Sequence, residues 1–500
     1  MSQPPPQMTL AALDLGSNSF HMLVARLEHG LPVIIDRIRE NVRLAAGLDA
    51  EKNLSEDACI RAISALQRFG ERLRDLPEEN VRAVGTNTLR KAKNGREFLT
   101  RARRVLGKDI EVISGREEAR MIYLGVAHSV DQSARRRLVV DIGGGSTELI
   151  VGERFDPLER DSVQMGCVRY TRKFFPKGEI TRHAMDQARL SAQLELRSLQ
   201  RHYRGLGWDQ CLGSSGTIKA VDDILRALGL PEAAITAEGL EGLEKRLVDQ
   251  GHVDGLSLPS MKPDRAAVLP AGLAILRAVF ESLRIDRMTV SSGALREGIL
   301  YDLLGRIRSE DVRNRTIRIF QSRYNVDREF AARLERTTLA LFEQGAESWD
   351  IDSVYGRQFL SWAVQLHEIG LSLSHGGYHR HGAYLIRNSD MRGFSRDDQE
   401  MVAAVVLGSR RRLRRDRLME VLPDGRVELA LRLAVFLRLA RRLHRSRSSR
   451  AVPEVKATFE GDTVSLTVPE GWLKLHPLTR ADLEDEAHIL QDAGIVLQVV

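Results

Sequence analysis

The alternation of apolar and polar positions predicts two α/β lobes in the first three-fifths of the chain. Residues 9–40 hold three apolar stretches separated by tight polar turns, which is typical of successive strands. Residues 55–73 then place apolar side chains every three or four positions, the spacing of one helix face. Residues 138–305 repeat this order of strands and helices, and a single long helix is expected at 264–283. We therefore expect two lobes with a cleft between them. The expected lobes are residues 1–127 and 128–308.

The pattern changes after about residue 310. Residues 311–447 show helical spacing almost throughout, with few strand signals. Past a stretch rich in serine and arginine, residues 455–468 alternate apolar and polar side chains about a Gly-Asp pair, which predicts a hairpin. We expect a helical domain at 309–447 and a small α+β domain at 448–500.

Composition narrows the cellular context. Apolar residues make up 43% of the 500 positions and charged residues 29%, which is ordinary for a soluble globular protein. The three cysteines, Cys59, Cys167 and Cys211, lie far apart and form neither a disulfide framework nor a zinc pattern, which fits a reducing compartment. The start of the chain lacks the layout of a signal peptide, and no apolar run is long enough to span a bilayer. We expect a cytoplasmic protein.

Positive charge is concentrated in the second half. The net charge is +7, and residues 410–450 contain fourteen arginines against four acidic residues. Such a region attracts an anionic polymer or an anionic lipid surface, so peripheral contact with the inner face of the membrane stays open; a solvated helix face is the alternative. Phe436 is the only aromatic residue within this range, so base stacking is poorly supplied and no nucleic acid is expected.

Two turns of small residues are the candidate chemistry. "LDLGSNSF" at 13–20 and "VVDIGGGSTELIV" at 139–151 each place an aspartate at a strand end, followed by glycine and small polar residues. Glycine lets backbone N–H groups approach a phosphate, although an ordinary glycine-rich hairpin is the alternative for either copy alone. A third stretch, "LGSSGTIKA" at 212–220, follows a strand and opens a helix, which favours an anion. The expected phosphate-binding residues are Gly16, Ser17, Asn18, Gly143, Gly144, Gly145, Ser146, Thr147, Ser215, Gly216 and Thr217. A carboxylate beside phosphate implies a bridging divalent cation, so Asp14 and Asp141 suggest Mg²⁺ or another divalent cation.

Seven motifs, in chain order, resemble one family: "DLGSNSF", "GTNTLR", "SGREEAR", "DIGGGSTEL", "MGCV", "GSSGTIKA" and "SGALREG". The chain resembles the exopolyphosphatase and guanosine pentaphosphate phosphatase family, within the actin-like ATPase and sugar-kinase superfamily. The resemblance implies an actin-like (ribonuclease H-like) α/β half of two lobes, then an all-α HD-like domain and a small α+β domain. "GTNTLR" and the third glycine of "DIGGGST" resemble the exopolyphosphatase branch. We therefore expect release of orthophosphate from the ends of inorganic polyphosphate, with conversion of guanosine pentaphosphate (pppGpp) to ppGpp as the alternative. The family also implies a homodimer.

The resemblance and local rules together select catalytic residues. A capping box from Ser114 to Glu117 would engage Glu117 and leave Glu118 free, and the family's general base also aligns with Glu118. The resemblance implies that Asp141 and Glu148 approach Mg²⁺, with Asp14 as their counterpart in the first lobe. Further candidates are Arg90 as a clamp on the phosphoryl group, and Lys219 and Arg296 near the third and fourth turns. A free Glu118 favours hydrolysis over the alternatives of a sugar kinase or a non-enzymatic actin-like protein.

Four histidines mark the helical domain: His367, His375, His379 and His381. Their cluster resembles the HD hydrolase domain, but the pair is His367-Glu368 and residues 310–366 contain no histidine for the upstream ligand. We therefore expect no catalysis of its own in this domain. Its histidines and the downstream arginines are expected to line a passage for a long phosphate chain.

Overall fold

The chain divides into two compact units, Met1–Asp311 and Val312–Val500. The computed structural model describes residues 8–28, 31–130, 134–229, 234–307, 312–422, 424–448 and 452–499. The expected boundary between the second lobe and the helical domain, at residues 308 and 309, lies outside the described residues. Each unit is treated by itself below.

The first lobe is a mixed sheet with helices on both faces. Its order is β3-β2-β1-β4-β5, with the first three strands antiparallel and β1, β4 and β5 parallel. Alternate residues of β1 enter two different cores: Leu13 packs with α1 and α3 on one face, and Ala12 packs with α4 on the other. The elements are β1 (Thr9–Leu15), β2 (Phe20–Glu28), β3 (Leu31–Glu40), η1 (Leu44–Gly47), α1 (Glu56–Leu73), η2 (Glu78–Asn80), β4 (Val81–Gly85), α2 (Asn87–Lys91), α3 (Gly95–Leu106), β5 (Ile110–Val112) and α4 (Gly115–Ala127).

The second lobe repeats this design in a six-stranded sheet of order β10-β11-β9-β6-β7-β8. The expected helix at 264–283 is wrong in one respect, because two helices occupy this range. Pro270 lies in the first turn of the second one, and its missing N–H and its steric demand on the preceding residue favour a helix start there. The elements are β6 (Arg136–Ile142), β7 (Thr147–Glu153), β8 (Asp156–Val163), α5 (Cys167–Phe174), α6 (Arg182–Leu196), α7 (Gln200–Leu206), β9 (Gln210–Ser214), α8 (Ser215–Ala227), β10 (Ile235–Thr236), α9 (Ala237–Gln250), η3 (Val253–Gly255), α10 (Pro263–Ala266), α11 (Leu269–Leu283), β11 (Arg287–Val290) and α12 (Leu295–Ile307).

The two glycine turns occupy equivalent positions in the two lobes. β1 and β2 are antiparallel with Leu15 opposite Phe20, while β6 and β7 are antiparallel with Ile142 opposite Thr147. Four residues therefore form each turn. In both lobes the first strand of the hairpin also has a parallel neighbour, β4 for β1 and β9 for β6. This arrangement confirms the predicted repeat of an α/β unit.

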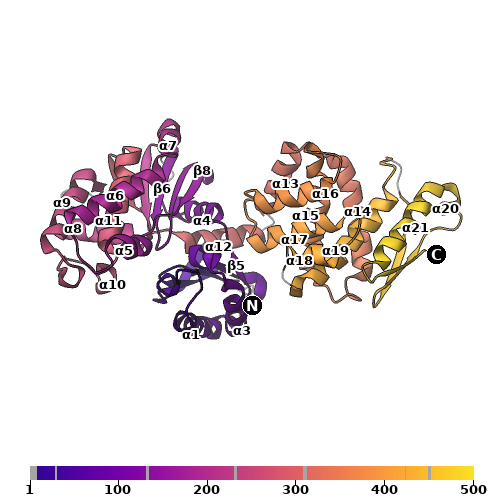
Figure 1. Cartoon of the computed structure of the whole chain (residues 1–500), viewed down its shortest axis with the longest axis horizontal. Helices are drawn as coiled ribbons and strands as arrows, with labels where there is room; N and C mark the ends of the chain where they lie inside the picture. Colours follow the sequence, from indigo (N-terminus) through magenta and orange to yellow (C-terminus); the bar gives the residue numbers. More distant parts are fainter. Residues whose placement is uncertain are drawn as a thin grey trace, which may run out of the picture. The chain divides into compact units, whose positions relative to one another are not determined.

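Helices α4 and α12 lie between the two sheets and cross at glycines (Figure 1). A Cβ on Gly298 would lie 1.7 Å from the Met121 carbonyl oxygen, and one on Gly125 would lie 2.1 Å from the Ala294 carbonyl oxygen. The two helix backbones are thus in direct contact. Beyond the crossing, Asp302 of α12 forms ion pairs with Arg120 of α4 and Arg82 of β4. Since α4 carries Glu118 and α12 carries Arg296, this contact positions two walls of one site.

Unit 2 has a core of its own. Its buried cluster extends from Ile317 to Leu497, and Trp349 and Phe436 of the helical part pack against Phe459 of the small sheet. The three-stranded sheet has the order β12-β13-β14, and the expected hairpin at 455–468 is confirmed as β12 and β13. The elements are α13 (Val312–Arg323), α14 (Arg328–Gly345), α15 (Ser353–Leu366), η4 (Ile369–Ser372), α16 (Tyr378–Asn388), α17 (Arg396–Gly408), α18 (Arg415–Met419), α19 (Asp424–Leu443), β12 (Lys456–Glu460), β13 (Thr463–Thr467), α20 (Trp472–Leu475), α21 (Pro477–Gln491) and β14 (Val496–Val499). Among the described residues, no helix combines the length and the apolar character that crossing a membrane requires.

Candidate active site

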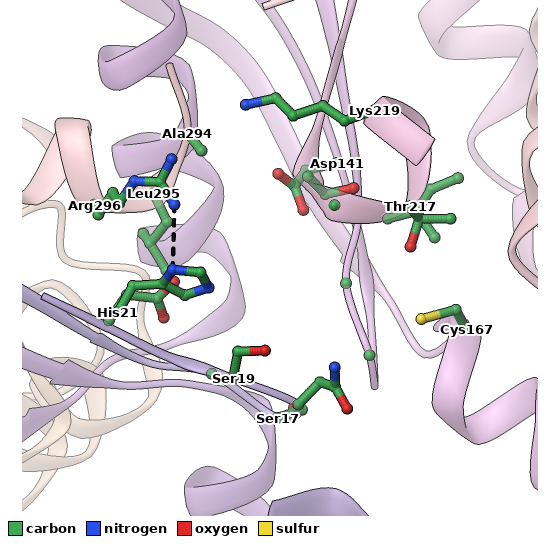
Figure 2. Close-up of a pocket in the computed structure, with 18 of the residues that line it drawn as sticks. Ser17, Ser19, His21, Asp141, Cys167, Thr217, Lys219, Ala294, Leu295 and Arg296 are labelled. Atoms are coloured by element: carbon green, nitrogen blue, oxygen red, sulfur yellow. Dashed lines mark hydrogen bonds between the residues drawn. The ribbon is translucent and has the colours of Figure 1, made fainter. Parts of the chain in front are cut away.

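Both glycine turns open onto one cavity of unit 1, about 480 Å³ in volume (Figure 2). The turns also touch each other, because a Cβ on Gly144 would lie 3.2 Å from the Ser17 Cβ. A Cβ on Gly145 would lie 2.6 Å from the Asn87 side-chain oxygen. A side chain at position 145 would therefore have to displace the Asn87 amide of the opposite lobe.

Arg172 of α5 holds the two lobes together beside these turns. Its guanidinium donates hydrogen bonds to the carbonyl oxygens of Ala45 and Leu48 in and after η1, each 3.2 Å long. This contact joins the second lobe to the first through backbone acceptors. We refer to it as the lobe clasp.

The third turn is strained. Ser215 opens α8 with φ at 81°, a left-handed conformation that is uncommon for a residue other than glycine. Its hydroxyl is buried and has no hydrogen-bond partner among the described residues. Strain of this kind persists where the surrounding structure imposes it, and it is concentrated at ligand sites. The turn therefore holds a free hydroxyl at the cavity wall.

Three buried polar atoms of the cavity lining lack a partner within the described part of the chain: Asp14 Oδ1, Asn87 Nδ2 and Ser215 Oγ. Buried polar groups are normally hydrogen-bonded, so three exceptions around one cavity call for an explanation. An oxyanion such as phosphate would accept from the Asn87 amide and the Ser215 hydroxyl. A cation would satisfy the Asp14 oxygen.

Four carboxyl groups gather here: Glu118, Asp141 and Glu148 are buried, and Asp14 is partly exposed with one buried oxygen. Burial, together with the nearby Glu118 and Asp141, raises the pKa of Asp14 to about 8. Burial likewise raises the pKa of Asp141 to about 6, and it raises the pKa of Glu148, which lies opposite Asp141 on β7. Carboxylates that repel one another in a buried site favour a bound cation.

The carboxyl groups of the cavity fit a cation that is also coordinated by oxygen atoms of a bound ligand. Within the described residues, no group of three histidine, cysteine, aspartate or glutamate side chains is arranged to enclose a metal ion. Mg²⁺ commonly uses only one or two carboxylates and completes its shell with waters and phosphate oxygens. Asp14 and Asp141, which both line the cavity, match that mode of binding.

Glu118 is held by Arg90. The Arg90 guanidinium lies 3.3 Å from a Glu118 carboxylate oxygen and donates to the Ile113 carbonyl at 2.6 Å. Burial raises the pKa of Glu118, while the Arg90 charge opposes that rise. Glu118 lines the cavity and Arg90 does not, so the structure places Arg90 behind the carboxylate and not on the cavity wall.

Glu117 is occupied, but by a different partner from the expected one. The Ser114 hydroxyl accepts from the Glu117 N–H at 3.1 Å, as a helix cap does. The Glu117 carboxylate, however, accepts hydrogen bonds from Arg120 through both of its oxygens, at 2.8 to 3.1 Å. Glu118 is thus the acid of this first turn that faces the cavity.

Three basic residues, His21, Lys219 and Arg296, line the same cavity as the carboxyl groups. His21 lies opposite Asp14 in the first hairpin, and its Nδ1 lies 3.3 Å from an Arg296 guanidinium nitrogen (Figure 2). Because arginine only donates, Nδ1 is the acceptor. Burial and the neighbouring Arg296 lower the pKa of His21 to about 3, so the ring is neutral and Nε2 carries the proton. Lys219 donates to the Ser292 carbonyl at 3.2 Å.

Most of the residues expected from the sequence lie on this cavity. The lining includes Asp14, Gly16, Ser17, Asn18, Glu118, Asp141, Gly143, Gly144, Gly145, Ser146, Ser215, Gly216, Thr217, Lys219 and Arg296. Arg90, Thr147 and Glu148 lie outside the lining: the Thr147 hydroxyl donates to the Met165 carbonyl, and Glu148 accepts from the Ser162 hydroxyl. Sequence reasoning missed His21, Asn87, Lys262 and Arg265, which also line the cavity.

The four histidines of unit 2 do not gather around one point suited to a metal in the described residues. His367 is fully buried, and its Nδ1 lies 2.6 Å from the Val364 carbonyl, while Nε2 lies 3.8 Å from a Glu368 oxygen and has no hydrogen-bond partner among the described residues. Burial lowers the pKa of His367 and of His379 to about 4 each. His375 lines a separate cavity of unit 2, and His381 is partly exposed.

Comparison with known proteins gives consistent matches. The Ppx/GppA phosphatase family matches residues 23–307, and domain III of the Ppx/GppA phosphatases matches residues 312–487. The chain is 41% identical over 501 residues to a guanosine-5'-triphosphate,3'-diphosphate pyrophosphatase of Vibrio campbellii, covering all of both chains. An Aeromonas hydrophila protein of the same name is 41% identical over 486 residues, covering 97% of each chain.

Two solved structures are similar to about three-fifths of the chain. An exopolyphosphatase from Cytophaga hutchinsonii is 25% identical with a TM-score of 0.54, covering 59% of this chain and 97% of that one. The Aquifex aeolicus PPX-GPPA enzyme is 28% identical with a TM-score of 0.50, covering 59% of this chain and 99% of that one.

Proposed function

The chain belongs to the Ppx/GppA phosphatase family, and on that premise we propose that it hydrolyses the terminal phosphoanhydride of guanosine pentaphosphate. The observation that carries this choice is the full-length identity of 41% to proteins named for that substrate. This is the second of the two activities that the sequence led us to expect. Inorganic polyphosphate is the other candidate substrate, supported by the likeness of 59% of the chain to a solved exopolyphosphatase.

The cavity offers donors for a chain of phosphates. The N–H groups of both glycine turns, the Asn87 amide and the Ser215 hydroxyl suit phosphate oxygens. Lys219, Arg296 and the protonated Nε2 of His21 add positive or donor groups on the same lining. Asp14 and Asp141 would hold Mg²⁺, which when bound neutralises charge on the phosphoryl oxygens.

Glu118 is the general base of the proposed reaction. A carboxylate whose pKa is raised by burial accepts a proton more readily near neutral pH. Glu118 would take a proton from the attacking water, while Arg90 holds the carboxylate in place from behind. The phosphoanhydride bond then breaks, and orthophosphate and the shortened substrate leave. No residue of the chain becomes covalently modified.

Competing substrates test the proposal. Initial rates of phosphate release from pppGpp and from long-chain polyphosphate are measured with Mg²⁺ at equal concentrations of terminal phosphate. We expect kcat/KM for pppGpp to exceed that for polyphosphate at least about tenfold, a difference in transition-state binding of about 1.4 kcal/mol. A preference for polyphosphate would reject the choice of substrate and leave the family assignment intact.

Glu118→Gln tests the catalytic role. Loss of a positioned general base lowers kcat by about 10² to 10⁴, with little change in KM. Glu79→Gln is the matched control, because Glu79 is an exposed glutamate of η2 that lies outside the cavity lining. Equal activities of the two variants would exclude Glu118 as the base.

A further inference from the structure

Unit 2 contains a second cavity, of about 710 Å³, lined largely by arginine. Its walls come from the loop before α16, the end of α17, the last turns of α19 with the residues after it, and α21. The charged lining comprises seven arginines and three acidic residues: Arg410, Arg411, Arg438, Arg441, Arg442, Arg445, Arg447, Glu368, Asp485 and Glu486.

Four of these arginines have carboxylate partners. Arg438 and Arg442 both pair with Glu486, the latter at 2.6 Å. Arg445 pairs with Asp482, and Arg447 pairs with Glu368. Three carboxylates therefore offset most of the charge of these four arginines.

Arg410, Arg411 and Arg441 have no carboxylate within ion-pair distance among the described residues. Arg441 instead donates to the Ser409 carbonyl and, at 2.8 Å, to the Tyr378 hydroxyl. Burial lowers the pKa of Arg441, as expected for a cation in weakly polar surroundings. Carbonyl dipoles at the end of α17 offset only part of such a charge. The cavity thus keeps an excess of positive charge.

The aromatic rings of the lining are already covered by cations. The Arg410 guanidinium lies 4.7 Å from the Tyr378 ring centre, and the Arg447 guanidinium lies 4.4 Å from the Phe330 ring centre. A nucleobase that stacked on either ring would compete with these contacts. The chemistry of the cavity therefore suits oxyanions and gives no platform for a base.

Glu368 and His444 in the lining already have partners within the protein. The carboxylate of Glu368, next to His367 in the HD-like motif, is bound by Arg447. His444 is also engaged, since its Nε2 lies 2.7 Å from the Thr337 hydroxyl. The position that resembles a metal pair is thus occupied by a guanidinium.

We propose that this cavity is a second binding site, specific for a compact inorganic polyanion of linked phosphates such as pyrophosphate or tripolyphosphate. Guanidinium groups bind phosphate oxygens in pairs with fixed geometry, and the lining has four more arginines than acidic residues, an excess of positive charge that suits such an anion. The backbone around Arg410 is already fixed, because Arg438 donates at 2.8 Å to the carbonyls of Gly408 and Arg411. The site belongs to unit 2 and does not depend on the substrate proposed for unit 1.

Hydrogen–deuterium exchange of the full chain tests this site. The probe is methylenediphosphonate, whose P–C–P linkage resists phosphoanhydride hydrolysis. We expect slower exchange in residues 371–381, 408–412 and 438–447, with an apparent Kd read from the protection of these segments alone. Protection of 13–20 and 142–147 in the same sample reports on the first cavity separately. No protection in the three segments of unit 2 at any probe concentration would overturn the proposal.

Two variants and one control refine the test. Arg441→Met removes the partly buried cation, and Arg410→Met removes a partly exposed one, which keeps the test decisive if the first variant fails to fold. Each is expected to weaken binding at the unit 2 segments about tenfold or more. Arg417→Met is the control, because Arg417 is exposed, lies in α18 and pairs with Glu420. An equal loss of binding with Arg417→Met would mean that binding depends only on the net charge of the protein, which contradicts the proposal.

Binding of GDP tests whether the cavity prefers an inorganic diphosphate or the diphosphate group of a nucleotide. If the cavity recognises phosphate oxygens alone, GDP protects the same segments no more strongly than methylenediphosphonate does. Protection by GDP at concentrations at least about tenfold lower would show that the base contributes, and it would overturn the assignment to an inorganic anion.

Discussion

Asp14 illustrates how much a single residue can be predicted from the sequence. Its position at a strand end before a glycine turn indicated a phosphate and cation site, and the structure puts it on the cavity with an unpaired oxygen. His21 was missed, although a hairpin with a four-residue turn places it opposite Asp14. Asn87 and Arg265 had no comparable signal, because they reach the cavity through the packing of separate segments.

The raised pKa of Asp14 predicts a pH dependence of stability in the absence of divalent cations. The folded pKa of about 8 lies above the ordinary value of 3.8, so the folded protein retains a proton that the unfolded chain releases. The free energy of unfolding therefore falls as pH rises from about 4 to about 8. Asp14→Asn removes this dependence, and its Tm relative to the unsubstituted protein should increase by several degrees between pH 5 and pH 8 in EDTA.

Thermal denaturation followed by circular dichroism measures this difference. Asp223→Asn is the control, because Asp223 lines the same cavity but is exposed and does not belong to the group of four carboxyls. A constant offset in Tm between Asp14→Asn and the unsubstituted protein across the pH range would contradict the assignment.

At the scale of elements, regular patterns were predictable and breaks in them were less so. Both glycine hairpins, the helix at 56–73 and the C-terminal hairpin follow from short-range periodicity. The break between α10 and α11 was missed because apolar spacing continues across it, although Pro270 was a local signal. The crossing of α4 and α12 could not be derived, because it depends on which glycines face each other.

Gly298→Ala tests that crossing. A Cβ at Gly298 would lie 1.7 Å from the Met121 carbonyl, so the helices must separate and the cavity walls must shift. Overpacking of this kind costs about 1–3 kcal/mol, and we expect a lower Tm together with a reduced kcat. Gly242→Ala in α9 is the matched control, because its Cβ would meet no atom within 4 Å. Alanine there should stabilise the helix by about 0.5–1 kcal/mol.

Activity and thermal denaturation are measured together on both variants. A Gly298→Ala protein with unchanged kcat and Tm would show that the two helices can separate without moving Glu118 or Arg296.

For the whole molecule, the sequence showed where the arginines are concentrated, but it did not show which of them form ion pairs with carboxylates. The arginines of residues 410–450 predicted attraction to anions, and four of those that line the unit 2 cavity are instead paired within the fold. Their partners Asp482 and Glu486 come from α21, and Glu368 comes from the segment before η4. Only the tertiary structure separates the paired arginines from Arg410, Arg411 and Arg441.

The separate cores of the two units predict two unfolding transitions. Leu66 is fully buried in the first lobe, and Leu334 is fully buried in unit 2. Leu66→Ala and Leu334→Ala should each destabilise one unit by about 2–5 kcal/mol. In differential scanning calorimetry we expect each variant to lower a different transition and leave the other in place. A single transition that both variants lower equally would indicate that the chain unfolds as one cooperative body.

The lobe clasp has a consequence for how the first cavity responds to its medium. Arg172 engages the backbone carbonyls of Ala45 and Leu48, so the contact is between a charge and two nearby dipoles. Dissolved salt screens attraction between distant ions much more than it weakens such short-range bonds. Raising the ionic strength should therefore slow the arrival of a multiply charged substrate, while the strength of this contact between the lobes stays nearly constant.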